Sequence, residues 1–523
     1  MTDRPGGPAN GAVPGGPANG PVPGGPAGGA VPGGPANGPV PGGPAGGAAP
    51  GGPAGGAVPG GPAGGAVPGG PANGAAPSPP SGRRRFGGLL RQRNFRLLWI
   101  GETVSQVGNA MAVVGVPLIA VLVLRASTFE VGVLTASAWL PWLVIGLPAG
   151  AWVDRLPARQ VMIACDLVSA LLYASVPAAD WAGVLTTGWL IIVQLVAGAA
   201  SVMFMTAYQV YLPSLVAPGE LIEGNTKMQG SASAAMFAGP GLAGLTAQLL
   251  GAVTALLGNA ISFLVSAGCL LGTRPPGRLI PQPRSGENTG RRTVRRRRVR
   301  RATSLRREIA DGTRLVMRDP FLRVLSVYGA AANLALTGYS ALLVVFLVRD
   351  IGLGPAAVGL LTAIPGVGGI LGALVTGRVT ARYGTARALL VCILGAVPFA
   401  LLIPLTGPGP RLVFYVAGVL VATTGVAVTN IIIAAFRQSY SPPGMCGRVT
   451  ATMRFLIFGT SPVGAVLGGS LGTWLGTRTA LWVLLGALVA SGALLLTRSL
   501  ISRRDLPDQP TPAVVDYRLQ GAR

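Results

Sequence analysis

The sequence contains no histidine, and lysine occurs once among its 41 basic residues. The absence of histidine removes the usual proton shuttle near neutral pH and the most common metal ligand, so any proton exchange must use a carboxylate. A zinc site or disulfide framework is not expected either, because no CxxC spacing joins the four cysteines Cys165, Cys269, Cys392 and Cys446. The chain also lacks a Gly-x-x-x-x-Gly-Lys-Ser/Thr phosphate loop. We therefore expect no metal, no cofactor and no direct use of ATP.

Charged residues are also scarce, at 11% of the chain against 50% apolar residues. Apolar runs long enough to cross a hydrocarbon layer of ~30 Å recur from about residue 97 to residue 497. The pattern predicts an all-α membrane protein with twelve transmembrane helices, at 97–124, 130–153, 161–179, 187–212, 227–250, 252–273, 321–348, 355–377, 386–405, 411–435, 449–472 and 478–498.

Composition also divides the chain into segments. Residues 1–82 repeat Gly-Gly-Pro-Ala every nine residues with almost no large apolar side chains, so they cannot bury enough surface to offset chain entropy. We expect a disordered cytoplasmic tail there. The remaining segments are an N-terminal six-helix bundle at 83–273, a basic cytoplasmic linker at 274–320, a C-terminal six-helix bundle at 321–498 and a cytoplasmic tail at 499–523.

The net charge of +25 comes largely from clustered arginines. Fifteen lie between Arg274 and Arg318 and six between Arg83 and Arg96, beside the apolar spans. By the positive-inside rule, this distribution predicts a multi-pass plasma-membrane protein with both termini and the linker in the cytoplasm. Binding of anionic lipid by the linker is the main alternative role for these arginines. Nucleic acid is not an expected partner, because the rest of the chain is mostly hydrophobic.

Two stretches of the chain are similar at an offset of 227 residues. The hexapeptide Val131-Gly-Val-Leu-Thr-Ala136 returns as Val358-Gly-Leu-Leu-Thr-Ala363. The same offset relates two further segments, Gly150-Ala-Trp-Val-Asp154-Arg155-Leu-Pro-Ala-Arg159 and Gly377-Arg-Val-Thr-Ala381-Arg382. Two similar halves of membrane helices are what a transporter needs to rock around a central site.

At Gly150–Arg159 the chain resembles the major facilitator superfamily, whose halves have six helices each. In that family the loop latches the cytoplasmic ends of the halves together, and the resemblance implies this role for Gly150, Asp154, Arg155, Arg159, Gly377 and Arg382. A carboxylate such as Asp154 is favourable near the positive N-terminal end of another helix. Because Ala381 replaces the aspartate in the second copy, the expected latch is asymmetric. The alternative is a basic loop that only orients the chain.

Two further resemblances concern the direction of transport. Gly239-Pro240-Gly241-Leu-Ala-Gly244 is similar to the Gly-Pro signature of the exporting, antiporter branch of the superfamily, although close packing of helices would also explain Gly239, Pro240 and Gly244. The segments Ala207–Val216 and Arg437–Val449 resemble the drug and siderophore exporters related to macrolide efflux and enterobactin export proteins. Asp166 also fits that subgroup.

Ionisable residues within the spans are few and costly, so each needs a reason. Glu102, Gln106 and Asn109 recur at helical spacing and share one face of the first span, which lines the central cavity in the family that the chain resembles. A carboxylate in a partly dry cavity suits proton exchange, so Glu102 is the leading candidate. Pairing with a nearby arginine such as Arg96 is an equal alternative. For Asp166 we favour a structural role beside the latch over proton exchange.

Further cavity candidates come from the fourth, seventh and tenth spans. Flexible thioethers, aromatic faces and amides suit varied hydrophobic ligands. Besides Gln106 and Asn109, the candidates are Met203, Tyr208, Gln209, Tyr328, Asn333, Tyr339 and Asn430. For each of them, ordinary helix packing is the competing explanation.

Together these features predict a monomeric secondary transporter, not an enzyme. We expect it to export hydrophobic or amphipathic small molecules by alternating access, driven by inward proton flow. Its expected partners are the lipid bilayer, the small-molecule substrate and protons. Two alternatives stay open: import of a small polar metabolite by the same fold, and a non-transporting membrane scaffold whose repetitive tail recruits partners.

Overall fold

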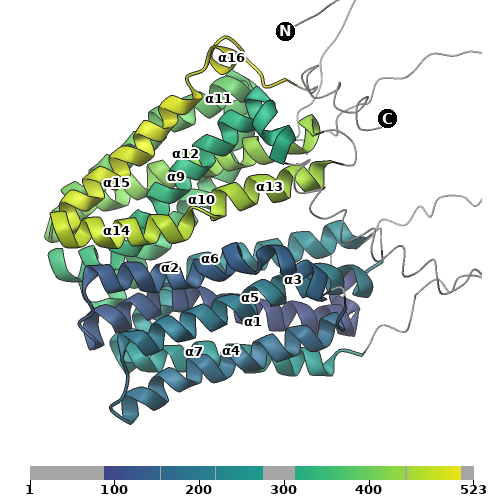
Figure 1. Ribbon diagram of the computed structural model, residues 1–523, viewed down its shortest axis with the longest axis vertical. Coiled ribbons are helices and arrows are strands. Elements are labelled where there is room, and N and C mark those ends of the chain that lie inside the picture. The colour runs from purple at the N-terminus through teal and green to yellow at the C-terminus, as the bar shows by residue number, and fades with distance from the viewer. Residues whose placement is uncertain (1–87, 154, 218–219, 275–312, 442–444, 508–523) are drawn as a thin grey trace, which may run out of the picture. The chain divides into compact units, whose positions relative to one another are not determined.

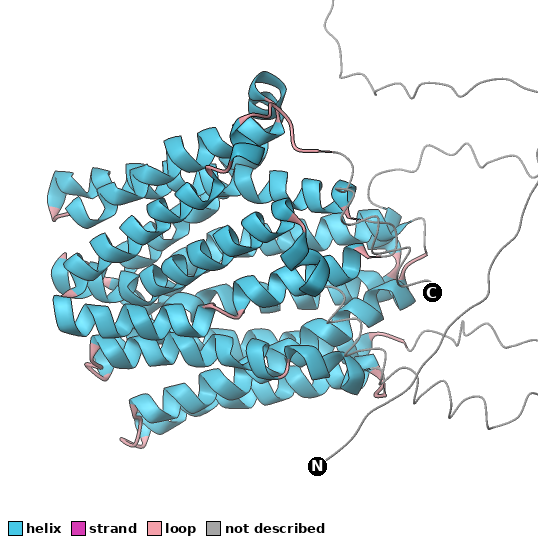
Figure 2. Cartoon of the chain, turned by 45° about the horizontal axis from the view of Figure 1, so that its top comes forward, coloured by secondary structure: helices cyan, strands magenta, loops and turns pink. Residues whose placement is uncertain are grey.

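A computed structural model describes residues 88–507, except Asp154 and residues 218–219, 275–312 and 442–444. The repetitive tail, most of the basic linker and the end of the C-terminal tail therefore lie outside the described residues. Within the described ranges every regular element is helical and no strand occurs (Figure 2). The apolar segments of the sequence fold as helices because helices satisfy every backbone N–H and C=O internally.

The N-terminal half begins with a short 3₁₀ turn, η1 (Gly88–Arg91). It continues as α1 (Arg93–Leu118), which ends in a π-helical turn, η2 (Ile119–Val123). The following helices are α2 (Thr128–Val144), α3 (Gly146–Val153), α4 (Ala158–Trp181), α5 (Thr187–Leu215), α6 (Leu221–Leu250) and α7 (Ala252–Gly272).

The C-terminal half starts with α9 (Pro320–Val345), which ends in the π-helical turn η4 (Phe346–Asp350). Next come α10 (Pro355–Tyr383), α11 (Thr385–Val391), η5 (Cys392–Ala396), η6 (Val397–Leu405), η7 (Gly409–Arg411) and α12 (Leu412–Tyr440). The last elements are α13 (Cys446–Phe458), α14 (Ser461–Leu475), α15 (Thr477–Ser491), η8 (Gly492–Leu495) and α16 (Arg498–Ile501).

Helices occupy all twelve predicted spans, and in the described residues ten are long and apolar enough to cross a membrane. The other two predicted spans contain α2, which is apolar but has 17 residues, and α6, which is long but less hydrophobic. Glu223 and Lys227 lie in the first turns of α6, where they form an ion pair of 3.5 Å. The protein is thus a multi-pass, all-α membrane protein.

Two predicted spans are broken where the sequence contains helix-disrupting residues. The span at 130–153 divides at Ile145 into α2 and α3, between Pro141 and Pro148. The span at 449–472 divides at Gly459 and Thr460 into α13 and α14, and Pro462 begins the new helix. A proline cannot donate the helical hydrogen bond to the preceding turn, so each break falls beside a proline.

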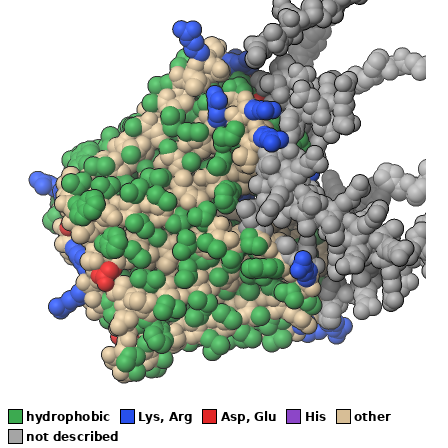
Figure 3. All heavy atoms as spheres, in the orientation of Figure 1, with side chains coloured by type: hydrophobic (Ala, Val, Ile, Leu, Met, Phe, Trp, Pro, Cys, Tyr) green, Lys and Arg blue, Asp and Glu red, His purple; other side chains and the backbone are tan. Residues whose placement is uncertain are grey.

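The two halves meet along two helix pairs, α2 with α14 and α6 with α10 (Figure 1). We call the end at which α1 begins and α7 stops the linker end, and the end with the α1–α2 and α9–α10 turns the far end. Hydrophobic side chains cover most of the visible face of both halves, while the basic side chains gather near the two ends (Figure 3). This distribution is that of a surface exposed to lipid.

Candidate functional site

A cavity of about 450 Å³ lies among the helices of the N-terminal half. Residues of α1, α2, α4 and α5 form most of its wall, and Phe263 of α7 adds a ring. Ser340 of α9 is the only lining residue that the C-terminal half contributes among the described residues. This volume falls within the range of small-molecule sites. The helical repeat of the sequence, in contrast, leads one to expect a site shared between two halves.

One face of α1 brings three of the predicted residues into the cavity wall. Glu102, Gln106 and Asn109 all line it, together with Ser105. The Gln106 Nε2 donates a hydrogen bond of 2.7 Å to Glu102 Oε1. The side chain of Glu102 is 7% exposed, and its second oxygen, Oε2, has no hydrogen-bond partner. Glu102 therefore lies in the cavity wall with one carboxylate oxygen buried and unpaired.

Asp166 of α4 lies in the same wall and is 1% exposed. The hydroxyl of Ser266 on α7 donates a hydrogen bond to its carboxylate, while Oδ2 has no partner. Asp166 is close enough to Glu102 for the two carboxylates to interact electrostatically. Neither forms an ion pair with a described residue, and Arg96, the alternative partner considered for Glu102, is exposed. The two carboxylates are therefore a buried acidic pair.

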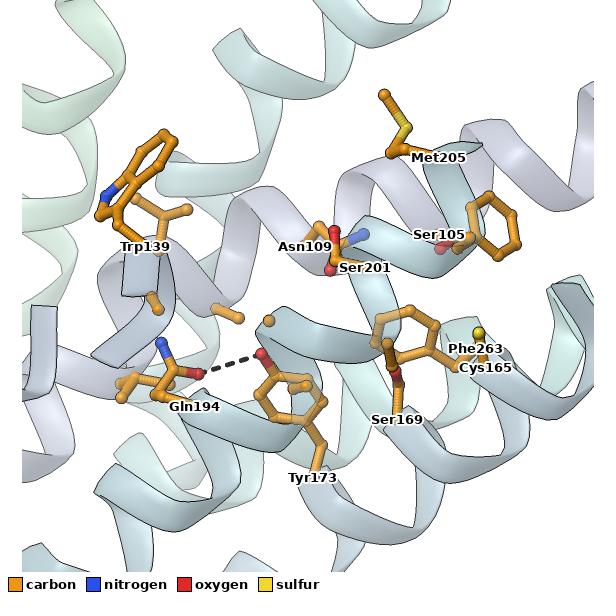
Figure 4. A pocket seen from close by; sticks show the side chains of 18 of the residues that line it. Ser105, Asn109, Trp139, Cys165, Ser169, Tyr173, Gln194, Ser201, Met205 and Phe263 are labelled. Carbon is orange, nitrogen blue, oxygen red and sulfur yellow. Dashed lines mark hydrogen bonds between the residues drawn. The ribbon is translucent and has the colours of Figure 1, made fainter. Parts of the chain in front are cut away.

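Aromatic and amide side chains complete the wall (Figure 4). Tyr173 donates its hydroxyl to Gln194 Oε1 at 3.1 Å, and its ring stacks on Phe263 with centroids 5.8 Å apart. Trp139 and Met205 lie on other sides of the same space. None of Trp139, Tyr173, Gln194 and Phe263 is among the candidates predicted from the sequence. Gln194, an amide within an apolar span, was the signal that could have drawn attention to this part of α5.

The remaining cavity candidates lie elsewhere. On α5, Met203 and Tyr208 are half-buried and Gln209 is exposed, and none of them lines the cavity, although Tyr208 interacts electrostatically with Glu102. On α9 and α12, four candidates are likewise outside the lining: Tyr328 and Tyr339 are buried in the core, Asn430 is exposed, and Asn333 binds the break between α13 and α14. The structure therefore unites the α1 candidates with Asp166 and separates them from the others.

Among the latch residues of the N-terminal half, Arg159 makes side-chain hydrogen bonds, and these stay within that half. Asp154 lies outside the described residues, and Arg155 is exposed. Arg159 donates hydrogen bonds to the carbonyls of Leu270 at 2.9 Å and Leu271 at 2.8 Å. These are the last carbonyls of α7, where a cation is favourable because they have no partner within the helix. Arg159 thus ties the α3–α4 loop to the linker end of α7.

The second copy of the latch segment, Gly377–Arg382, forms the last turns of α10. A Cβ atom added to either Gly150 or Gly377 would meet no described atom within 4 Å, so neither glycine lies at a close helix contact in this structure. Arg382 places its guanidinium 5.7 Å from the centre of the adjacent Tyr383 ring. Beside it, Asp505 Oδ1 accepts a hydrogen bond of 2.8 Å from the backbone N–H of Thr385, so the C-terminal segment caps α11.

Glycine pairs bring the halves together toward the far end. A Cβ on Gly132 of α2 would lie 2.7 Å from the Cα of Gly469 of α14. Likewise, a Cβ on Gly244 of α6 would lie 2.7 Å from the Cα of Gly359 of α10. Gly132 and Gly359 are corresponding residues of the 227-residue repeat. The repeated hexapeptide therefore places a helix–helix contact on each side of the molecule.

Other contacts between the halves accompany these pairs. Arg349 at the end of η4 donates a hydrogen bond of 2.6 Å to the carbonyl of Ala126, in the turn between α1 and α2. Further from that end, Trp139 of α2 stacks on Phe458 of α13, with ring centroids 5.9 Å apart and planes 5° from parallel. Because Trp139 also lines the cavity, this stack joins the cavity wall to the other half. Gly239, in contrast, contacts Ala110 of α1, within its own half.

Two helical halves that pair through α2 with α14 and α6 with α10, with a cavity of small-molecule size in one of them, have the architecture of a membrane transporter. Residues 98–461, more than half of the chain, match the family model described as the Major Facilitator Superfamily. The chain belongs to this superfamily.

Individual relatives are distant. The chain is 24% identical over 421 residues to the multidrug efflux pump Tap of Mycolicibacterium fortuitum, covering 79% of this chain and 98% of that protein. A crystal structure of a bacterial homologue of the iron transporter ferroportin, in an inward-facing state, aligns with a TM-score of 0.60 at 16% identity, over 77% of this chain and 98% of the other. The nucleoside transporter NupG aligns with a TM-score of 0.58 at 15% identity, over 77% and 98%. These structures share the fold.

Proposed function

We propose that this transporter exports hydrophobic or amphipathic small molecules in exchange for protons that enter the cell. The observation that carries the proposal is the buried acidic pair, Glu102 and Asp166, in the wall of the cavity without a cationic partner among the described residues. Similarity to a multidrug efflux pump and the Gly239–Gly244 motif support the outward direction.

The physical argument starts from the cost of a buried charge. An unpaired carboxylate in a dry environment is unfavourable, so it is stabilised either by binding a proton or by pairing with a cation. Glu102 satisfies one oxygen with Gln106 and keeps the other available. A group that faces alternately one solution and then the other can bind a proton on one side and release it on the other, which couples the gradient to the rocking of the halves.

The two ends of the molecule differ in their contacts and in their charge, and this difference indicates which side of the membrane each end faces. Glycine pairs and Arg349 join the halves toward the far end. We propose that this end faces the outside of the plasma membrane, because the arginine-rich linker and both tails attach at the other end.

This orientation can be tested by cysteine labelling. In a variant without the native cysteines, an impermeant thiol reagent should label Val184→Cys in intact cells and Arg155→Cys only after permeabilisation. The reverse pattern would contradict this orientation.

The coupling role of Glu102 is tested with Glu102→Gln in proteoliposomes under an imposed pH gradient. The substitution keeps the size of the side chain and its hydrogen bond to Gln106 but cannot exchange a proton. We expect gradient-driven transport of dyes and macrolides to fall to the level without a gradient, while binding of the same compounds remains. The matched control is Asp180→Asn, which removes a carboxylate at the end of α4, outside the cavity lining.

Full gradient-driven transport by Glu102→Gln would remove the proposed proton site. The direction of transport is a separate readout. In intact cells that carry the parent protein, an exporter lowers the internal concentration of its substrate. Accumulation of the same compound would contradict export and would favour uptake by the same fold.

A further inference from the structure

The charged side chains that line the cavity, among the described residues, are all acidic. Two carboxylates, Glu102 and Asp166, lie in its wall, and no lysine or arginine is among its described lining residues. Each carboxylate keeps one oxygen without a hydrogen-bond partner, Oε2 of Glu102 and Oδ2 of Asp166. Both side chains are more than nine-tenths buried. The two unpaired oxygens therefore belong to carboxylates of α1 and α4 that are close enough to interact electrostatically.

Aromatic rings line the same cavity as this acidic pair. The lining includes Trp139 and Trp142 of α2, Tyr173 of α4, Phe204 of α5 and Phe263 of α7. The face of an aromatic ring is electron-rich and attracts a cation, most strongly where water is excluded. The same faces also offer apolar area to a flat organic molecule. A cation with an aromatic body would thus be favoured by both the carboxylates and the walls.

We propose that the cavity selects organic monocations with a flat apolar body, and that Asp166 supplies the opposite charge that holds them. This inference rests on the proposed function in one respect, that the transported compound occupies this cavity. Glu102 and Asp166 together allow one carboxylate to carry a proton while the other pairs with the cation. A neutral compound gains only the ring contacts, and an anion is repelled by the pair.

The choice of Asp166 for the substrate follows from the hydrogen bonds. Glu102 is held by Gln106, on its own helix, and the pair moves with α1. Asp166 is bonded to Ser266 of α7 and is adjacent in the sequence to Cys165, which also lines the cavity. On the same helix, Ser169 and Tyr173 continue the lining one and two turns further along. Asp166 is therefore the acidic end of a strip that a flat ligand can contact along α4.

The test measures binding to the purified full-length protein at equilibrium, with no pH gradient. The probes are N-methylacridinium, a monocation, and acridine, which is neutral at pH 7.5 and has the same ring system. Asp166→Asn should weaken binding of N-methylacridinium by at least about 30-fold, the lower range for loss of one partner of a buried charge pair. Binding of acridine should change by less than about twofold, because its ring contacts remain.

Two further variants keep the test decisive. Asp166→Glu retains the charge and should preserve the preference for the cation, which separates a charge effect from a folding defect. Asp180→Asn, outside the cavity, should leave both affinities unchanged. Equal weakening of both probes by Asp166→Asn, or unchanged binding of N-methylacridinium, would overturn the proposal. Because no proton gradient is present, that result would not bear on the role of Glu102 in coupling. Conversely, full gradient-driven transport by Glu102→Gln would not bear on the expected preference of the cavity for cations.

Discussion

Glycines set how closely the two halves approach. Gly132 and Gly359, one from each copy of the repeat, let α2 and α10 contact α14 and α6 with no side chain between the backbones. In membranes, where the hydrophobic effect does not drive helices together, close packing of small residues is a main source of association. The Gly239–Gly244 motif contributes to this through Gly244, whereas Gly241 of the same motif has no described atom within 4 Å of an added Cβ.

Gly241 and Gly244 therefore provide a matched pair of substitutions. Gly244→Ala places a methyl group against Gly359 and should destabilise the folded protein by about 1–3 kcal/mol, the usual cost of overpacking. Gly241→Ala adds the same methyl group in open space and should be neutral or slightly stabilising, because alanine favours the helix by roughly 0.5–1 kcal/mol. Thermal unfolding in detergent compares the two. Equal melting temperatures would show that the close contact does not matter.

The acidic and polar residues of α1 illustrate how far a site can be predicted from sequence. Glu102, Gln106 and Asn109 share a face by spacing alone, and in the structure they line one cavity. The reading of α5 shows the limit. Met203 is a predicted candidate that does not line the cavity, whereas Ser201, two positions earlier, does. Two positions along a helix rotate a side chain by roughly 200°, and hydropathy does not reveal which face of an apolar helix turns inward.

At the level of the helices, the break between α13 and α14 is held by a side chain from another helix. Asn333 of α9 donates from Nδ2 to the carbonyl of Ile457 at 2.9 Å and to Ser461 Oγ at 2.8 Å. Thr460 Oγ1 in turn lies 3.1 Å from the carbonyl of Ala330. These bonds satisfy polar groups that a broken helix leaves open within the membrane.

Asn333→Ala should therefore weaken the attachment of this break to α9. Loss of two hydrogen bonds is expected to cost about 1–3 kcal/mol and to lower the melting temperature. Because Phe458 precedes the break and stacks on Trp139, the change should also alter the fluorescence of the tryptophans. Asn430→Ala, an exposed asparagine of α12, is the control and should do neither. If both variants melt at the parent temperature, the break is stable without Asn333.

The helices themselves could be predicted and their interruptions could not. Hydropathy alone placed helices in all twelve predicted ranges, because each range needs only enough apolar residues to cross the bilayer. Proline within a membrane helix is ambiguous, since neighbouring side chains can satisfy the groups it exposes. Pro240 lies inside an unbroken α6, whereas Pro462 follows a break. The groups opened at the break before Pro462 are satisfied by Asn333, which is more than 120 residues away in the sequence.

For the molecule as a whole, the repeat predicts the pairing of the halves but not the location of the cavity. The halves meet symmetrically, through α2 with α14 and α6 with α10. The cavity is asymmetric, because all its described lining residues except Ser340 belong to the N-terminal half. Glu102 corresponds to Gly329 in the repeat, so the second half has no counterpart of the acidic carboxylate. Similar backbones have thus retained different side chains at equivalent places.

In the proposed transport cycle the halves separate along the contact between α6 and α10, so a disulfide across this contact should stop transport. An ideal Cβ on Gly366 of α10 lies 3.1 Å from the Cβ of Phe237 on α6, near the separation of roughly 3.5–4.5 Å found in disulfides. In a background without the native cysteines, Phe237→Cys with Gly366→Cys should form a disulfide and lose transport, and a reductant should restore it. Neither Phe237 nor Gly366 is among the described residues that line the cavity, so equilibrium binding of a substrate should persist. Each single cysteine variant is the control. Transport by the oxidised double variant would mean that the halves do not separate along this contact.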